Sequence, residues 1–183
     1  QQQQPEQQPQ GQDDQPAQGE QTASPSATGA KPGWPASVQK LTLEKGKAIQ
    51  VNGLLANAAK VDRPSLPATC IAASDKGDFS GKQVLFGATL PANSDVDIAV
   101  SPNEASKKIA IYAYTLPEGR FDLPDQANNA SSCRSSKKAG MFSRDAGPRI
   151  EISGGKQPQN LVIGVAGGPD ATAGDGRVSV KAY

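Results

Sequence analysis

Alternation of apolar and polar residues over short stretches constrains the fold of this chain more than any other feature of its sequence. Residues 84–90 read VLFGATL, with apolar side chains at every second position, and residues 95–101 read DVDIAVS. A period of two places successive side chains on opposite faces of a β-strand. Because no stretch shows a sustained helical period of 3.6, the chain is predicted to be all-β.

The pattern recurs further along the chain. Residues 107–116 (KKIAIYAYTL) place aliphatic side chains on one face and Tyr112 and Tyr114 on the other, which predicts a central strand covered on both faces. Further strands are predicted at 149–153, 160–166 and 176–182, with a short edge strand at 71–73. Eight or nine short strands of this kind predict an antiparallel β-sandwich that is jelly-roll-like.

Two hairpins are expected among these strands. Residues 84–90 and 96–100 are separated by the turn residues Ala92-Asn93-Ser94 and are predicted to pair, with one face exposed to solvent. Residues 38–43 and 48–51 are predicted to form an opening hairpin around Lys45-Gly46-Lys47.

The first 36 residues differ in composition from the rest. About half of residues 1–21 are Gln, interrupted by Pro and without one large apolar side chain. Such a segment cannot bury enough surface to offset the entropy cost of ordering it. We therefore predict a disordered Gln/Pro-rich tail or linker at residues 1–36 and a β-sandwich domain at residues 37–183.

The charge distribution bears on the class of partner. The predicted tail holds four acidic residues against Lys31, a net charge of −3, so an overall charge of +1 leaves +4 for the domain. A net charge of +4 is far below the density of positive charge that is typical of a nucleic-acid-binding domain. Nucleic acid is therefore not an expected partner.

The start of the chain and its apolar runs bear on location. A chain that begins at Gln1 rather than Met is expected to be exported and to have lost a signal peptide, the alternative being a recombinant fragment cut at this point. The longest apolar run, residues 109–114, is far shorter than the roughly 18 residues that cross a bilayer. We expect a secreted, periplasmic or cell-surface protein without a transmembrane segment.

Cysteine usage agrees with export. Cys70 and Cys133 are the two cysteines of the chain, and it contains no His with which they could form a mixed metal site. An even pair in an exported chain predicts one disulfide, with two free thiols as the alternative.

The sequence argues against catalysis. The absence of His removes the commonest general base at neutral pH and excludes Ser-His-Asp and Cys-His systems. Ser-x-x-Lys occurs three times but without a Lys-Thr-Gly partner, as chance supplies in a Ser- and Lys-rich chain. Residues 77–82 (GDFSGK) are one residue too short for a phosphate loop and are better explained by a hairpin turn. We predict that the chain is not an enzyme and has no catalytic residues.

Two groups of residues are candidates for binding. Asp170 and Asp175 lie in the glycine-rich loop 167–176 and offer two carboxylates to Ca²⁺, although a solvated turn also explains them. No cofactor is otherwise predicted. The basic residues of the loop before position 149 are candidates for contact with anionic glycans, lipid head groups or an acidic protein, the alternative being a solvated loop. These residues are Arg134, Lys137, Lys138 and Arg144.

Three segments carry a resemblance to a known family. They read VLFGATLPANSDVDIAVSP, KKIAIYAY and NLVIGVAGGPDATAGDGRVSV. The second half of the chain, about residues 84–183, resembles the bacterial pre-peptidase C-terminal domain, in which an aromatic-bearing strand ends in Leu-Pro-Ala-Gly and a later strand reads similarly to LYVY. Phe86, Leu90-Pro91-Ala92 and residues 111–114 match these motifs. The resemblance implies a jelly-roll-like sandwich and a non-catalytic accessory module of secreted bacterial proteins.

Two hypotheses about function follow. The first is a non-catalytic structural or accessory protein that acts by protein–protein interaction in a bacterial envelope or extracellular assembly. The alternative is a glycan- or Ca²⁺-binding module. Under the first hypothesis the partner is another envelope or extracellular protein, and the sequence leaves its identity and the oligomeric state open.

Overall fold

The computed structural model describes residues 33–53, 55, 58–60, 70–71, 77, 79–102, 109–127, 130–137, 147–167 and 176–183. The compact unit that contains them is Pro32–Tyr183. Nearly all of the tail predicted at residues 1–36 lies outside the described residues. Trp34, which the sequence analysis placed in that tail, is half-buried and packs edge-on against Phe121, with ring centroids 4.9 Å apart.

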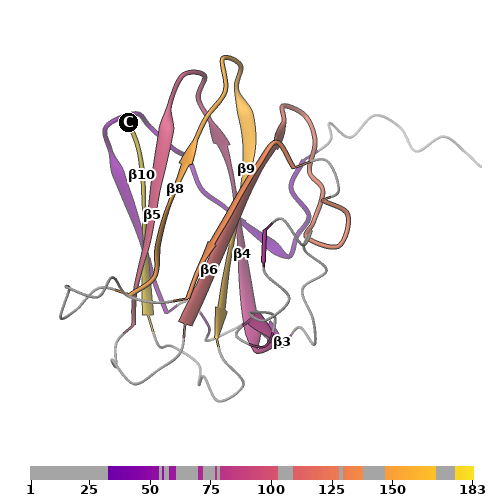
Figure 1. The fold of residues 1–183 in the computed structure, drawn as a ribbon, viewed down its shortest axis with the longest axis vertical. Coiled ribbons are helices and arrows are strands. Elements are labelled where there is room, and N and C mark those ends of the chain that lie inside the picture. Colours follow the sequence, from indigo (N-terminus) through magenta and orange to yellow (C-terminus); the bar gives the residue numbers. More distant parts are fainter. Residues whose placement is uncertain are drawn as a thin grey trace, which may run out of the picture. The chain divides into compact units, whose positions relative to one another are not determined.

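The described residues form ten β-strands and no α-helix, so the all-β prediction is confirmed (Figure 1). The strands are β1 (Val38–Lys40), β2 (Ala48–Asn52), β3 (Ala59–Lys60), β4 (Lys82–Leu90), β5 (Asp95–Pro102), β6 (Ile109–Pro117), β7 (Ser132–Ser136), β8 (Arg149–Ser153), β9 (Gln159–Gly167) and β10 (Gly176–Ala182).

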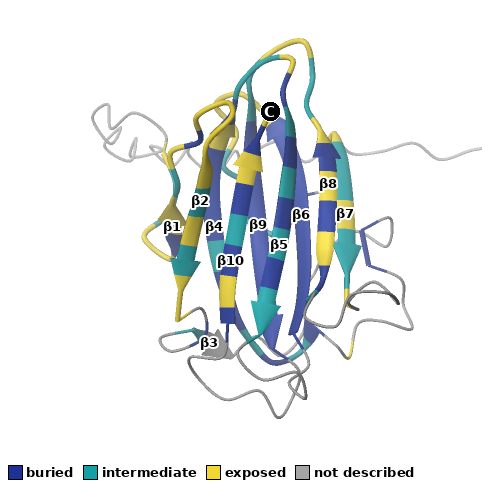
Figure 2. Ribbon diagram, turned by 90° about the vertical axis from the view of Figure 1, so that its left-hand side faces the viewer, coloured by how far each residue is buried: buried dark blue, intermediate teal, exposed yellow. Residues whose placement is uncertain are grey.

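The strands form two sheets that face each other, as the sandwich prediction requires (Figure 2). One sheet has the order β1-β4-β9-β6-β7, with β3 also paired to β4, and the other has the order β2-β10-β5-β8. Neighbouring strands are antiparallel except β1 and β4, which are parallel.

The main hydrophobic core lies between the sheets. Phe86 of β4, Ile98 of β5 and Ile163 of β9 are fully buried there. Phe86 and Ile98 come from the alternate positions that the period-2 pattern assigned to one face of their strands. Burying each such side chain contributes about 1.5–3 kcal/mol, so the aliphatic faces supply most of the driving force for folding.

A second apolar cluster covers the outer face of the six-stranded sheet. Tyr112 and Tyr114 of β6 are fully buried in it together with Phe79 and Ile71, which precede β4. Every residue of β6 except its last is buried. The prediction of a strand covered on both faces is therefore confirmed.

Both predicted hairpins are wrong. β4 pairs with β9 and belongs to the six-stranded sheet, whereas β5 pairs with β10 and β8 in the other. The connection between them crosses the sandwich, with Asn93 in the left-handed region at φ 52°. This crossing is held by the neighbouring β8–β9 connection, because Asn93 N–H donates to Gly155 O and Gly154 N–H donates to Ser94 O.

The opening segment also divides between the sheets. β1 pairs with β4 and β2 pairs with β10, so the two strands do not form a hairpin. Gly46, at φ 84°, lies in the link between them and donates its N–H to Ala182 O at 2.7 Å. The strand expected at 71–73 is not seen at Ile71, which lies in a bend; residues 72 and 73 are outside the described part of the chain.

Candidate functional site

The outer face of the four-stranded sheet is the broad polar surface of the described domain. Along β8 and β10 exposed or half-buried residues alternate with buried ones, and along the edge strand β2 exposed residues alternate with half-buried ones (Figure 2). The corresponding face of the other sheet is largely covered by the second apolar cluster. We call this exposed surface of the four-stranded sheet the outer face.

The register arranges the outer face in rows across the strands. One row contains charged side chains at three of four positions and runs across β2, β10, β5 and β8 as Ala48, Lys181, Asp97 and Glu151. In the next row the first three side chains are small or uncharged and the fourth is a cation. Across the same four strands this row consists of Gln50, Ser179, Ala99 and Arg149. Short side chains at the middle positions leave a flat centre between charged flanks.

An ion pair fixes one end of this surface. Arg149 of β8 donates from Nε to Asp97 Oδ1 at 2.6 Å and from Nη2 to Asp97 Oδ2 at 2.8 Å. The hydrogen bond to Asp97, and then its charge, raise the pKa of the Arg149 guanidinium. Such an exposed pair contributes only about 0–1 kcal/mol to stability, but its two-point geometry holds both side chains in place.

Tyr183 extends the outer face beyond β10. Its backbone N–H donates to Asp95 O and its O accepts from Asp95 N–H, both at 3.0 Å. The Tyr183 hydroxyl donates to the Glu151 carboxylate, and this hydrogen bond is the main reason that the pKa of Tyr183 rises to about 12. With 44% of its surface accessible, Tyr183 is the exposed large hydrophobic residue of the described chain.

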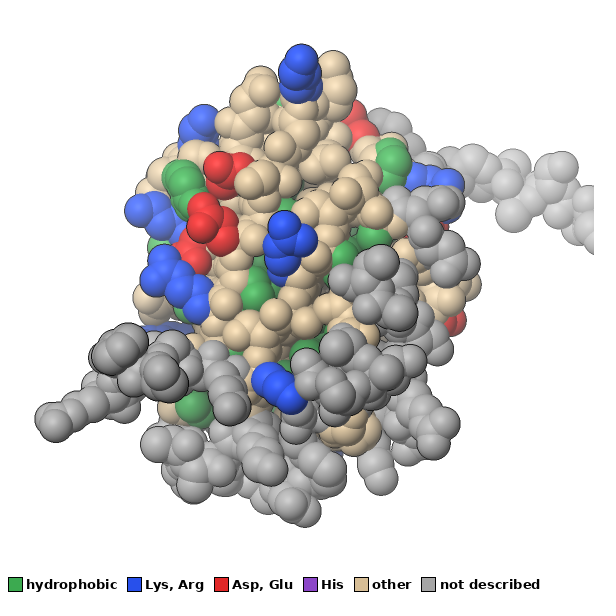
Figure 3. All heavy atoms as spheres, viewed as in Figure 1, with side chains coloured by type: hydrophobic (Ala, Val, Ile, Leu, Met, Phe, Trp, Pro, Cys, Tyr) green, Lys and Arg blue, Asp and Glu red, His purple; other side chains and the backbone are tan. Residues whose placement is uncertain are grey.

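Acidic and basic side chains are interspersed on the side of the molecule formed by β10, β5 and β8 (Figure 3). At one end of this side, a shallow hollow of about 340 Å³ is lined by Asn52, Ser101, Pro102 and Arg177. The hollow offers an amide, a hydroxyl and a guanidinium to a polar ligand.

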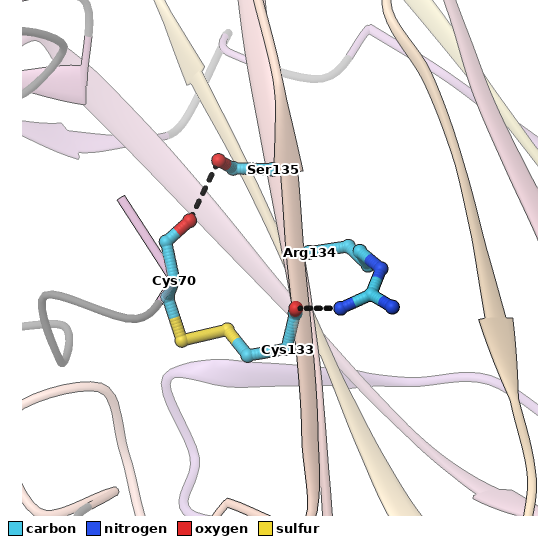
Figure 4. Close-up of a disulfide and its surroundings, with 4 residues drawn as sticks. All are labelled: Cys70, Cys133, Arg134 and Ser135. Carbon is cyan, nitrogen blue, oxygen red and sulfur yellow. Dashed lines mark hydrogen bonds between the residues drawn. A yellow bond between two sulfur atoms is a disulfide. The ribbon is translucent and has the colours of Figure 1, made fainter. Parts of the chain in front are cut away.

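The predicted disulfide is confirmed. Cys70 and Cys133 are bonded, with their Cα atoms 5.2 Å apart, and join the segment before β4 to β7. The Ser135 hydroxyl donates to Cys70 O at 2.7 Å and reinforces the same connection (Figure 4). The sequence analysis missed β7 itself, because its residues SCRSS lack apolar alternation.

The predicted basic group is only partly described. Arg134 is exposed on β7 and donates from Nη1 to Cys133 O at 3.0 Å, and Lys137 is exposed just after that strand. Lys138 and Arg144 lie outside the described residues, so this binding group stays a prediction.

The predicted Ca²⁺ ligands Asp170 and Asp175 also lie outside the described residues, and this site stays a prediction. In the ranges that the structure describes, no three or more residues of the types His, Cys, Asp and Glu form a group that could hold a metal ion. Asp95 and Asp97 share one face of β5, but Asp97 is engaged by Arg149. None of the described residues form a helix of the length and apolarity that crossing a bilayer requires.

No family model matches the chain, and no curated protein matches it. Solved structures that do match include the pre-peptidase C-terminal domain of a collagenase from Bacillus anthracis, at 10% identity and a TM-score of 0.36, over 82% of this chain and 99% of that domain. The family that residues 84–183 resemble in sequence is therefore among those whose solved structures match.

Two further structures match at 10% identity, each over 80% of this chain and 98% of its own. They are PliG, a periplasmic inhibitor of g-type lysozyme from Aeromonas hydrophila, with a TM-score of 0.42, and CorA, a surface-associated copper-binding protein of Methylomicrobium album BG8, with a TM-score of 0.41. At this identity the likeness concerns the fold alone. By its own fold and surface, the described chain is a disulfide-bonded β-sandwich domain with one sheet face open and polar.

Proposed function

We propose that this chain is a non-catalytic extracytoplasmic module that binds another protein through the outer face of its four-stranded sheet. The observation that carries the proposal is the contrast between the two sheets. One outer face is largely covered by the chain's own apolar cluster, while the other presents ordered charges around a flat centre. A surface of this kind is suited to a protein partner with complementary charges.

The charges of the outer face balance. Three cations, Arg149, Arg177 and Lys181, stand among three acids at positions 95, 97 and 151. A neutral, patterned surface does not attract one sign of charge at long range but selects a partner by position. Arg and Tyr are enriched among residues that dominate binding energy, and Arg149 and Tyr183 are already held by Asp97 and Glu151. Such preorganisation lowers the entropy cost of association.

The size of the surface bears on the kind of complex that it can form. Four strands spaced about 4.8 Å apart and seven residues rising about 3.3 Å each give a face of roughly 450 Å². A standard interface buries about 800 Å² on each partner. We therefore expect a transient contact, or a partner that also reaches the hollow at Arg177.

The cysteine chemistry supports the proposed location. The Cys70–Cys133 bond persists in an oxidising compartment, which supports a secreted, periplasmic or cell-surface protein. The bacterial envelope or extracellular setting rests on the resemblance of residues 84–183 to the pre-peptidase C-terminal domain.

Substitutions at the flat centre test the proposal. Ala99→Arg and Ser179→Arg place a large cation where a partner would lie, without touching the core. The matched control is Thr89→Arg, because Thr89 is exposed on the opposite sheet. Cross-linking in envelope fractions should capture a protein that the control retains and both face variants lose. Capture that is equal for all variants, or no capture at all, contradicts the proposal.

A second candidate is a glycan- or Ca²⁺-binding module, supported by the polar hollow of Asn52, Ser101 and Arg177. Asp170 and Asp175 precede β10 and are its proposed Ca²⁺ ligands. Ca²⁺ and anionic sugars should then raise the melting temperature, and Arg177→Ala should abolish the response to sugars. An unchanged melting temperature with every ligand contradicts this candidate.

A further inference from the structure

Strand β2 leaves one long edge of the four-stranded sheet open. It is the first strand in the order β2-β10-β5-β8, and in the described ranges no other strand pairs with its far side. Exposed strand edges present unpaired backbone groups, so natural proteins protect them with Pro, charges or bulges. The sequence of β2, AIQVN, contains neither Pro nor a charged residue.

The open edge presents regularly spaced hydrogen-bonding groups. Gly53 N–H donates to Gly176 O at 3.1 Å, which makes Gly53 and Gly176 a hydrogen-bonded pair. Bonded and non-bonded pairs alternate along an antiparallel ladder, so Val51 and Ile49 also bond to β10. The N–H and C=O groups of the remaining three residues therefore point away from β10. These residues are Ala48, Gln50 and Asn52, all of them exposed.

We propose that two copies of this chain pair antiparallel through β2, about a two-fold axis that passes between their Gln50 residues. In this register Gln50 faces Gln50 of the second copy, and Ala48 faces Asn52. The outward N–H and C=O groups of each pair then satisfy one another, with the Gln50 amides able to bond across the axis. The same strand meets itself, as a two-fold interface requires.

The side chains of β2 suit this register on both faces. On the core side, half-buried Ile49 faces Val51 of the second copy, a pair of β-branched residues of the kind that stabilises adjacent strands. On the outer side, Ala48 and Asn52 bring no charge into the contact. Glu44 and Lys47, just before β2, form an ion pair with each other.

Charge repulsion does not oppose the pairing. The cations nearest to the new contact on the outer face are Lys181 and Arg177, both on β10. Across the axis, Lys181 of one copy and Arg177 of the other are separated by three strand spacings, about 14 Å. This exceeds the Debye length of about 8 Å at physiological salt, so the repulsion is largely screened. The product is one continuous sheet of eight strands.

Cross-linking through an introduced cysteine tests the register. Paired residues in a hydrogen-bonded antiparallel pair have Cα atoms about 5.5 Å apart, within the range that a disulfide bridges. The full chain carrying Gln50→Cys should therefore form a disulfide-linked dimer under mild oxidation. Neither Ala48→Cys nor Asn52→Cys should form a disulfide-linked dimer alone, but a mixture of the two should give a disulfide-linked heterodimer. Ser153→Cys, on the opposite edge strand β8, is the exposed control and should form no disulfide-linked dimer.

Charge substitution on the axis tests the association itself. In analytical ultracentrifugation at up to millimolar concentration, Gln50→Lys or Gln50→Glu alone should weaken self-association at least tenfold, because like charges then face each other. Mixing the two variants should restore it as a heterodimer. A monomer at every concentration with no Gln50→Cys dimer, or cross-linking of Ser153→Cys equal to that of Gln50→Cys, overturns the proposal.

This proposal is independent of the partner-binding function proposed above, and the tests keep the two apart. Ala99→Arg lies two strands from the open edge and should leave self-association unchanged. Loss of association in Ala99→Arg would place the contact on the outer face and overturn the pairing through β2.

Discussion

The ring of Tyr112 on β6 occupies the space beside Gly164 on the neighbouring strand β9. A Cβ atom at position 164 would lie 2.0 Å from Tyr112 Cζ. The Tyr112 hydroxyl donates to Gln83 Oε1 at 3.0 Å, and Gln83 Nε2 donates to Phe79 O at 2.7 Å. This buried chain of bonds ties the segment before β4 to the outer face of the six-stranded sheet, and it depends on Gly164 for room.

Gly164→Ala should therefore destabilise the domain strongly. The methyl group displaces an aromatic ring that is fully buried and hydrogen-bonded, so we expect a loss of about 3 kcal/mol, at the upper end of overpacking costs. Urea unfolding measures this loss of stability. Gly77→Ala is the control, because a Cβ at Gly77 meets nothing within 4 Å. Equal midpoints for the two variants would show that the ring moves without cost.

The period-2 pattern located the long strands because it reflects which side chains are buried. The strands predicted at 149–153 and 176–182 match β8 and β10. Strands β3 and β7 were missed because they are short or polar, and nothing in their own residues marks their pairing with β4 and β6. Apolar and polar residues alternate in a strand that has one buried and one exposed face. A polar edge strand lacks this alternation, so the sequence does not reveal it.

Pairing could not be derived in the same way. A few turn residues between two strands fit a hairpin as well as a crossing from one sheet to the other. At residues 91–94 the crossing is selected by contacts with the connection after β8, where a Cβ on Gly154 would lie 2.2 Å from Ser94 O. That contact joins residues sixty positions apart, so no local reading of the sequence contains it.

The candidate surface was visible in the sequence only in pieces. The alternation of apolar and polar residues in 176–182 indicates that Arg177, Ser179 and Lys181 face away from the core, and in the structure these three positions are exposed or half-buried between buried ones. Their neighbours across the sheet, Asp97 and Arg149, follow from the register and not from spacing. The sequence does contain one indication of close aromatic packing, which is the presence of glycines within strands β4 and β9. A glycine inside a strand often marks a position that another group approaches closely. At Gly87 the approaching ring is that of Trp34.

Loss of the disulfide should weaken the domain without changing its fold. Cys70 and Cys133 are 63 residues apart, and in the chain-entropy model closing a loop of that length contributes about 4 kcal/mol. We expect the double variant Cys70→Ser, Cys133→Ser to lose stability on this scale in urea unfolding. Reductant should destabilise the native protein to the same extent and leave the variant unaffected. Equal stability of native and variant proteins would show that the bond is not structural.

Thr115 of β6 offers a stabilising substitution. Its hydroxyl is fully buried and has no hydrogen-bond partner among the described residues. Thr115→Val removes an unsatisfied polar atom while keeping the shape of the side chain, so the free energy of unfolding should rise by about 1 kcal/mol. Thr115→Ser keeps the hydroxyl and removes the methyl group, and should lower the free energy of unfolding by about 1 kcal/mol. A Val variant less stable than the native chain would reveal an undetected partner.

The tyrosines predict how the protein responds to alkaline pH. Burial raises the pKa of Tyr112 and Tyr114, and the hydrogen bond to Glu151 raises that of Tyr183 to about 12, against 10.0 for an ordinary tyrosine. Because the folded-state pKa values lie above the unfolded ones, the tyrosines contribute stability that is fully present below pH 10. The contribution of Tyr183 is lost as the pH rises from about 10 to about 12.

Ultraviolet absorbance during an alkaline titration resolves these groups, since the chain has three tyrosines. The native protein should show no ionisation near pH 10, and a first step near pH 12 that Tyr183→Phe removes. Glu151→Gln takes away the negative acceptor, so that step should move back toward pH 10. In denaturant all three tyrosines should ionise together near pH 10. A Tyr183 step near pH 10 in the native protein would mean that the bond to Glu151 is not formed in solution, and that this end of the outer face is not held in place.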